Sequence, residues 1–422
     1  MKWLATLAAG WLLASAVAGS PRGTADAAAA GARQQELTAP GGAAADLFGR
    51  AVGLSGHTAV VGAPIHPLGS NVAQGAAYVF TQSGPAWRAS GRLAASDGAA
   101  GDLFGSSVAV AGPTAVVGSP HHRVGSARLE GAVYVFTRVG GSWVQSAELT
   151  ARDGRPSDEF GFSVALSGST AVVGAPYHAV GSNIEQGAAY VFVRRGSSWT
   201  QAGELTAADG GEYDNLGTAV AVDAGTVVVG SDGHQVGANA EQGDAYVFTP
   251  DGTSWRQTAE LRASDGNPED FFGSAVAISG STIVVGAPDH AAHGPGPEGA
   301  AYVFTGSGSA WTERARLAAA PARGARRTYF GCSVAVSGTV TIVGGDGHQV
   351  GADREQGLAY VFVRRGSSWA SSGGLTASDG APYDNLGYAV AVSGRAALVG
   401  APGHTVGGRR AQGAAYVFGG LP

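Results

Sequence analysis

The sequence predicts an all-β protein, a seven-bladed β-propeller with four antiparallel strands per blade. Three observations support this fold class: a sevenfold repeat, short apolar runs between glycine-rich turns in every repeat, and a fragment of the last repeat at the other end of the chain. Repeats of this kind are typical of solenoids and propellers, and the displaced fragment favours a closed ring.

Each repeat begins at a Phe-Gly or Leu-Gly pair. Successive pairs stand 56 residues apart, except for 58 residues between the fifth and the sixth. The pairs are Phe48-Gly49, Phe104-Gly105, Phe160-Gly161, Leu216-Gly217, Phe272-Gly273, Phe330-Gly331 and Leu386-Gly387.

The third repeat shows four strand-like segments clearly. They are residues 162–166, 170–173, 188–192 and 199–206, with a longer turn at 194–198. β-Branched and aromatic residues dominate these segments, and Gly and Ser separate them, which predicts strands joined by turns. The chain after residue 18 has no helical periodicity.

The fourth strand of the last repeat is missing at the C-terminus, because the sequence ends just after Phe418 in the third strand. The segment Glu36–Ala39 has the sequence of Glu148–Ala151, which belongs to a fourth strand. The N-terminal segment is therefore expected to complete the seventh blade and close the ring, which protects the sheet edges.

The ends of the chain predict a secreted protein. Lys2, the apolar stretch 3–17 and the small residues 16–18 indicate a signal peptide over residues 1–18. We expect a low-complexity linker over 19–33, the propeller over 34–418, a tail over 419–422, and no membrane span. The single cysteine, Cys332, allows no disulfide within the chain and is expected to be a buried, inert thiol. We expect an extracellular monomer, with association to a bacterial cell surface as an option.

The Phe-Gly pairs together with Gly-Ala-Pro after the second strand, as at Gly174–Pro176, resemble FG-GAP repeats. These repeats form the head propeller of integrin α subunits and occur in secreted bacterial proteins. The resemblance implies a seven-bladed propeller whose loops bind proteins or glycans. The calcium loops of integrin repeats lie between the first and second strands. Here that link is a short turn such as Ser167–Ser169, which cannot supply six to eight oxygens, so we expect no metal and no cofactor.

A histidine stands four residues after a Gly near the end of every second strand. The seven are His66, His122, His178, His234, His290, His348 and His404. Six repeats carry an Asp two residues before the Phe-Gly pair: Asp46, Asp102, Asp158, Asp214, Asp270 and Asp384; the sixth has Thr328. Sevenfold repetition favours a structural role in which each His pins a loop, and ring geometry keeps the seven from sharing one central metal. A functional role in titration or binding is the alternative.

The inner strand ends are expected to contribute Arg50, Ser106, Phe162, Thr218, Ser274, Cys332 and Tyr388 to the mouth of the central channel. No acid is among them, so we expect a non-enzymatic binding or adhesion module. The alternatives are a hydrolase that uses loop carboxylates and a structural envelope protein without a discrete ligand.

The net charge of −6, with mixed signs, argues against nucleic acid as a partner. Arginines gather where the later repeats differ from the others. Arg323, Arg326, Arg327, Arg409 and Arg410 are the candidate ligand-binding residues, and an acidic polysaccharide is a candidate partner because guanidinium groups bind carboxylate and sulfate. Solvated arginines on variable loops are the alternative interpretation.

Overall fold

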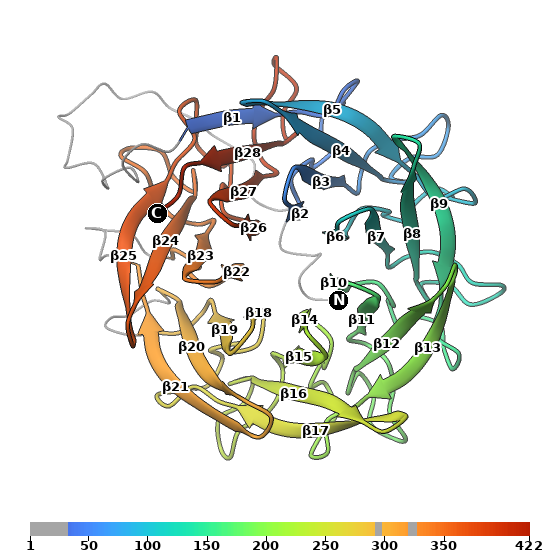
Figure 1. Ribbon diagram of the computed structural model, residues 1–422, viewed down its shortest axis with the longest axis vertical. Helices are drawn as coiled ribbons and strands as arrows, with labels where there is room; N and C mark the ends of the chain where they lie inside the picture. The colour runs from blue at the N-terminus through green and yellow to red at the C-terminus, as the bar shows by residue number, and fades with distance from the viewer. Residues whose placement is uncertain (1–32, 292–297, 320–326) are drawn as a thin grey trace.

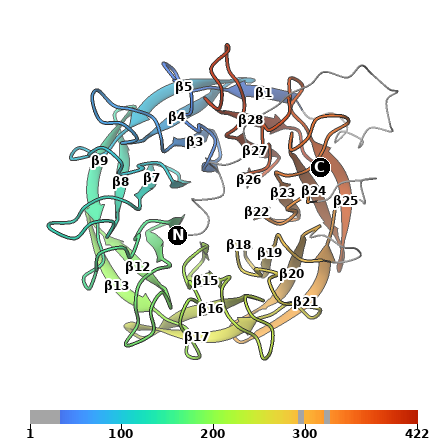
Figure 2. The ribbon, with the colours of Figure 1, turned by 180° about the vertical axis from the view of Figure 1, so that it is seen from behind.

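The computed structural model describes residues 33–291, 298–319 and 327–422. These residues form seven four-stranded antiparallel sheets arranged as blades around a central axis (Figure 1). The predicted seven-bladed β-propeller is confirmed. Its first strands lie innermost and its fourth strands outermost, as the view from behind also shows (Figure 2).

Each of the first six blades uses four consecutive strands. Blade 1 contains β2 (Val52–Ser55), β3 (Thr58–Ala63), β4 (Ala76–Ser83) and β5 (Ala86–Leu93). Blade 2 contains β6 (Ser107–Ala111), β7 (Thr114–Ser119), β8 (Ala132–Val139) and β9 (Ser142–Leu149). Blade 3 contains β10 (Ser163–Ser167), β11 (Thr170–Ala175), β12 (Ala188–Arg195) and β13 (Ser198–Leu205).

The remaining blades follow the same order. Blade 4 contains β14 (Val220–Asp223), β15 (Thr226–Ser231), β16 (Asp244–Asp251) and β17 (Ser254–Leu261). Blade 5 contains β18 (Ala275–Ser279), β19 (Thr282–Ala287), β20 (Ala300–Ser307) and β21 (Ala310–Leu317). Blade 6 contains β22 (Val334–Ser337), β23 (Val340–Gly345), β24 (Leu358–Arg365) and β25 (Ser368–Leu375). Blade 7 contains β26 (Val390–Ser393), β27 (Ala396–Ala401), β28 (Ala414–Gly419) and β1 (Arg33–Leu37).

The N-terminal strand closes the ring. β1 pairs with β28 in antiparallel register, from Arg33 opposite Gly419 to Leu37 opposite Ala415. Leu37 is 2% exposed and joins the core between blades 7 and 1. The closure expected from the repeat pattern is therefore present in the structure.

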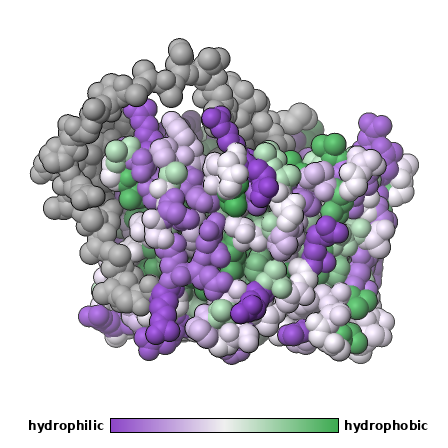
Figure 3. Space-filling view, turned by 90° about the horizontal axis from the view of Figure 1, so that it is seen from above, coloured by the Kyte–Doolittle hydropathy of each residue, from purple (hydrophilic) through white to green (hydrophobic). Residues whose placement is uncertain are grey.

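The hydrophobic core lies between neighbouring blades. Between blades 2 and 3, Phe160 packs against Tyr190 and Phe192, with ring centroids 5.5 and 5.9 Å apart. The middle strands are buried on both faces and so read as continuous apolar runs, whereas the outer strand β13 alternates in exposure. Edge-on, the outer wall shows hydrophilic and hydrophobic residues interspersed (Figure 3).

The repeated glycines form the contacts between blades. Gly105 has a φ of 95°, and a Cβ there would lie 2.5 Å from the carbonyl oxygen of Ala76 in the preceding blade. A Cβ on Gly62 would lie 2.0 Å from the carbonyl oxygen of Gly105. Only glycine fits at these two positions, so the Phe-Gly pair and the Gly-Ala-Pro segment recur together.

The strand ends differ from the sequence expectation by one to three residues. In blade 3 the expected turn over 194–198 is shorter, because Arg195 pairs with Ser198 and leaves two residues in the turn. At the C-terminus the last strand extends to Gly419, and Leu421 is buried beside it.

The antiparallel order gives the ring two distinct faces. The loops between second and third strands and the segments between blades lie on one face, named here the loop face. The short turns between first and second strands and between third and fourth strands lie on the other, named the turn face. In the described part of the chain, no helix has the length and apolar character to cross a membrane.

Candidate functional site

The histidine ring lies on the loop face, and six of its members pair with an aspartate. The Nδ1–H group of each His donates to Oδ2 of the Asp 20 residues earlier in the chain, at 2.7–2.8 Å. Both side chains of each pair are buried. The pairs are His66–Asp46, His122–Asp102, His178–Asp158, His234–Asp214, His290–Asp270 and His404–Asp384.

Each pair joins two backbone segments. Oδ2 of Asp158 also accepts a hydrogen bond from the backbone N–H of Arg155, and the carbonyl of His178 accepts one from Gly187. The segment between blades is thereby tied to the loop that follows the second strand. In blade 6, where Thr328 replaces the Asp, Nδ1 of His348 instead contacts the hydroxyl of Tyr360 at 2.9 Å.

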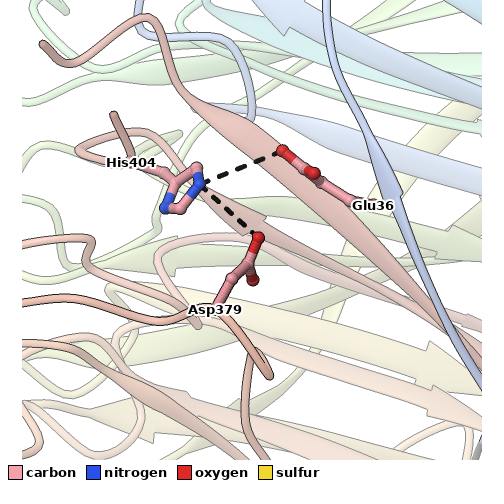
Figure 4. A group of neighbouring side chains, drawn as sticks. All are labelled: Glu36, Asp379 and His404. Carbon is pink, nitrogen blue, oxygen red and sulfur yellow. Dashed lines mark ion pairs between the residues drawn. The ribbon is translucent and has the colours of Figure 1, made fainter. Parts of the chain in front are cut away.

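Carboxylates also face the other ring nitrogen. In blade 7, Nε2 of His404 lies 3.9 Å from Oε1 of Glu36 and 3.9 Å from Oδ2 of Asp379 (Figure 4). The strand β1 supplies Glu36, and the segment between blades 6 and 7 supplies Asp379.

The same arrangement occurs in blades 2 and 3. Nε2 of His178 lies 3.9 Å from Asp153 and 3.9 Å from Glu204, and Nε2 of His122 lies 3.7 Å from Asp97. Glu148 completes the group in blade 2. We call these three groups the Asp–His–Glu clusters; their members are Asp97, His122 and Glu148; Asp153, His178 and Glu204; and Asp379, His404 and Glu36.

The pKa values of the histidine and the glutamate in each cluster are raised. In blade 7 the hydrogen bond from His404 to Asp384 raises the pKa of His404, although burial acts against it. Burial raises the pKa of Glu36, and the negative charge of Asp379 adds to the rise. The cluster is therefore a site of concentrated negative charge that favours a cation.

The sequence prediction missed these clusters, because it considered the His and only one Asp in each repeat. The repeat spacing could have revealed them, because Asp97, Asp153 and Asp379 occupy one repeat position, and Glu148 and Glu204 occupy another.

The mouth of the central channel holds two acids that the sequence prediction missed. Asp232 and Asp346 stand where other repeats have the Pro of Gly-Ala-Pro. Asp232 bridges two blades, with Oδ1 3.0 Å from Oγ1 of Thr218 and Oδ2 3.3 Å from Oγ of Ser274. The sequence prediction did not include these two acids, because it considered only the residues that precede the first strands and left the acids of the connecting loops open.

Burial raises the pKa of both carboxyl groups to about 6. Asp346 interacts with the Cys332 thiol, whose pKa is raised well above its usual range by burial and then by the charge of Asp346. That thiol stays protonated at neutral pH and is a poor nucleophile. Between the neighbouring blades 7 and 1, the guanidinium of Arg50 lies 5.0 Å from the ring centre of Tyr388.

The tips of the loops between second and third strands present exposed side chains on a fixed backbone. One residue in each loop, named here the loop-tip residue, accepts a backbone hydrogen bond of 2.9–3.0 Å from the segment before the next blade. The side chains at this position are exposed in six blades and differ in chemistry. The described loop-tip residues are Val72, Arg128, Ile184, Ala240, Arg354 and Arg410.

Exposed apolar side chains also gather on this face. Ile184 is 52% exposed and neighbours Tyr213, which is 55% exposed and donates its backbone N–H to the carbonyl of Ile184. In the same blade Phe162 packs against Tyr177 with ring centroids 6.1 Å apart.

The predicted arginine group is divided among blade junctions. Arg327 is exposed in the segment between blades 5 and 6, whereas Arg409 and Arg410 are exposed on the loop that contacts the junction of blades 7 and 1. Arg323 and Arg326 lie outside the described residues. Arg354, which the sequence prediction did not include, lies at the junction between these two places.

The links between first and second strands are short turns, as at Ser167–Thr170. In blade 4 the single carboxylate, Asp223, accepts a hydrogen bond of 2.7 Å from the backbone N–H of Gly280 in the next blade. This carboxylate therefore joins two blades.

Comparisons with known proteins agree with this architecture. One solved structure, titled "Crystal Structure of Mitotic Checkpoint Complex", contains a chain that superposes with a TM-score of 0.55 at 12% sequence identity, covering 97% of this chain and 100% of that one. At that identity the likeness concerns the fold alone. No curated protein shows significant sequence similarity to the chain.

A family profile described as "FG-GAP repeat" matches seven segments, one per repeat. They are residues 32–80, 87–136, 143–192, 199–248, 255–304, 311–362 and 369–418. The matches span nearly the whole propeller, and the chain belongs to the FG-GAP repeat family.

Proposed function

We propose that the protein is a secreted, non-enzymatic binding module that receives an extracellular protein or glycan on its loop face. This proposal rests on the loop-tip residues. Their backbone is held by hydrogen bonds to the segment before the next blade, while their exposed side chains are apolar in three blades and arginine in three. A rigid scaffold with varied exposed side chains suits recognition, because little ordering entropy is lost on binding.

The secreted location rests on the sequence of residues 1–18, which lie outside the described part of the structure. The positive Lys2, the apolar stretch and the small residues before Gly19 are typical of a signal peptide. Expression of the full chain with detection in the culture medium, and determination of the mature N-terminus, tests this location.

A glycan array probed with the mature protein tests the binding function. The double variant Ile184→Asp/Tyr213→Ala changes the exposed apolar pair on the loop face. Val139→Asp, at a 62% exposed position on the turn face, is the matched control. We expect a glycan signal that falls at least tenfold in the loop-face variant and stays within twofold in the control. Equal loss in both, or loss in the control alone, contradicts the proposal.

Hydrolysis is a second candidate function, favoured by Asp232 and Asp346. A carboxyl group with a pKa near 6 can serve as a general acid near neutral pH. Products released from an array glycan, and lost in Asp232→Asn/Asp346→Asn while binding remains, would establish an enzyme. Binding without any product supports the non-enzymatic module.

A further inference from the structure

The Asp–His–Glu clusters contain the ligand set of a divalent transition metal. Each offers one imidazole nitrogen and two carboxylate oxygens, all within 4.8 Å of one another. Imidazole nitrogen with carboxylate oxygen is a ligand set that Zn²⁺ accepts at about 2.0–2.2 Å, usually with tetrahedral geometry. Two ligands of one such ion lie about 3.3–3.5 Å apart. The distances from Nε2 to a carboxylate oxygen are 3.7–3.9 Å, and all the ligand atoms of a cluster lie within 4.8 Å of one another, so rotation of the acids can bring them to that spacing.

The buried histidines point an uncommitted nitrogen into these clusters. His178 is 2% exposed, and His122 and His404 are each 7% exposed. Among the described residues, the hydrogen bonds of these rings run through Nδ1. The carboxylate contacts of Nε2, at 3.7–3.9 Å, are too long for hydrogen bonds.

Neighbouring side chains hold the ligands in place, through a carboxylate in all three clusters and a tyrosine hydroxyl in blades 2 and 7. The carboxylate on Nδ1 fixes the tautomer that leaves the lone pair on Nε2, which is the usual arrangement around a metal-bound histidine. The hydroxyl of Tyr416 donates to Oδ1 of Asp379 at 3.0 Å, and that of Tyr134 donates to Oδ1 of Asp97 at 2.9 Å. In each case Oδ2 remains turned toward Nε2.

In blade 5 a positively charged side chain of the protein occupies the place that the metal ion would take in the clusters. Arg316 stands at the repeat position of Glu148 and Glu204. Its Nη1 lies 2.5 Å from Oδ2 of Asp265 and 3.3 Å from Nε2 of His290, so the guanidinium occupies the place between the same two ligand types. Blade 4 is similar, because Arg262 pairs with Asp244 at 3.0 Å and also with Glu260.

We propose that blades 2, 3 and 7 each bind one divalent transition-metal ion, with Zn²⁺ as the preferred ion, through the Asp–His–Glu cluster. The sequence expectation of no metal considered the turns between first and second strands and a single central site, and neither consideration applies to these clusters. In each blade the ion joins the segment before the blade, the loop after the second strand and the fourth strand. In blade 7 it also joins β1 to the C-terminal repeat, across the ring closure (Figure 4).

Titration of chelator-treated, dialysed full-length protein with Zn²⁺ tests the proposal. Isothermal calorimetry gives the stoichiometry, and the visible spectrum of Co²⁺ reports the coordination. We expect three ions per chain. Glu148→Gln and Glu204→Gln should each reduce the number to two, and the triple variant that includes Glu36→Gln should bind none. Glu212→Gln, an exposed glutamate outside the clusters, is the control and should still bind three.

A variant that gains a metal site provides a second test, because a misfolded protein would not bind an additional ion. Arg316→Glu completes the set in blade 5 beside Asp265 and His290, so this variant should bind four ions. Ca²⁺ should not displace Zn²⁺, because a site with a nitrogen ligand and two carboxylates falls short of the six to eight oxygens that Ca²⁺ takes. Absence of binding up to millimolar Zn²⁺, or a stoichiometry unchanged in all the glutamate and arginine variants, would overturn the proposal.

Discussion

The hydroxyl groups beside Asp232 each have one proton and two acceptors. Oγ1 of Thr218 lies 2.8 Å from the carbonyl oxygen of Asn215 and 3.0 Å from Asp232. Oγ of Ser274 lies 2.7 Å from the carbonyl oxygen of Phe271 and 3.3 Å from Asp232. Burial raises the pKa of Asp232 to about 6. It outweighs the hydrogen bonds from these hydroxyls, which favour the charged carboxylate and so lower its pKa.

A raised pKa in the folded state makes Asp232 destabilising above that pKa. The unfolded chain loses the proton near pH 4, whereas the folded chain keeps it until about pH 6. The free energy of unfolding should therefore fall as pH rises from 4 to 6 and level off above. Asp232→Asn cannot ionise, so in urea unfolding it should match the parent at pH 4 and exceed it at pH 8 by roughly 1–3 kcal/mol. A variant that is less stable than the parent at pH 8 contradicts this assignment; Asp251→Asn, an exposed position, is the control.

The structural role of the His–Asp pairs is best tested in blade 1. There Gly41 and Arg92 replace the acids that face Nε2 in blades 2 and 3, so only the pair of His66 with Asp46 remains. Asp46 is 0% exposed, and His66→Ala leaves its charge without the ring.

We expect His66→Ala to cost about 1.5–3 kcal/mol of unfolding free energy, the range for a hydrogen bond to a charged group. Chemical denaturation measures this cost. Asp46→Asn should cost a similar amount, and the double variant should cost less than the two together. His57→Ala, an exposed histidine, should change the free energy by no more than about 0.5 kcal/mol. If His66→Ala lowers the free energy of unfolding no more than His57→Ala does, the pair has no structural role.

At the scale of elements, the sequence predicted all four strands of each repeat, because alternation and turn residues agree with the sheet. The strand ends differ from the prediction by one to three residues. β12 continues to Arg195 because it pairs with β13 beyond the buried residues. The local sequence alone does not predict that pairing. The side chains that meet at the site belong to separate elements, as Glu36 and His404 do, so their proximity follows from ring closure and not from any local motif.

We expect cooperative unfolding of the ring to depend on the strand β1. Deletion of residues 33–40 exposes the edge of β28 and removes Leu37 from the core between blades 7 and 1. An unpaired edge strand is a template for pairing with another chain. We expect loss of cooperative thermal unfolding and self-association in sedimentation velocity. Deletion of residues 1–32 alone is the control and should remain monomeric. A monomer of unchanged melting temperature after the longer deletion would show that closure does not depend on β1.

At the scale of the whole molecule, exposed arginines occupy neighbouring junctions of the loop face. Exposed Arg327, Arg354 and Arg410 stand at three consecutive junctions, from blade 5/6 to blade 7/1. The repeat pattern held this information too, since Arg354 and Arg410 share one repeat position, but only a structure assigns them to neighbouring junctions.

This series of arginines gives the last prediction, binding of an acidic polysaccharide. Guanidinium groups at successive junctions can each pair with a sulfate or carboxylate along one extended chain. In surface plasmon resonance on an immobilised sulfated polysaccharide, Arg354→Glu/Arg410→Glu should bind at least tenfold more weakly than the parent. Parental binding should also weaken steeply with salt, because exposed charges are screened beyond about 8 Å at physiological ionic strength. Arg195→Glu/Arg365→Glu makes the same change of charge on the turn face and should bind within twofold of the parent. If the two double variants weaken binding equally, the interaction depends on net charge and the arginines of the loop face form no site.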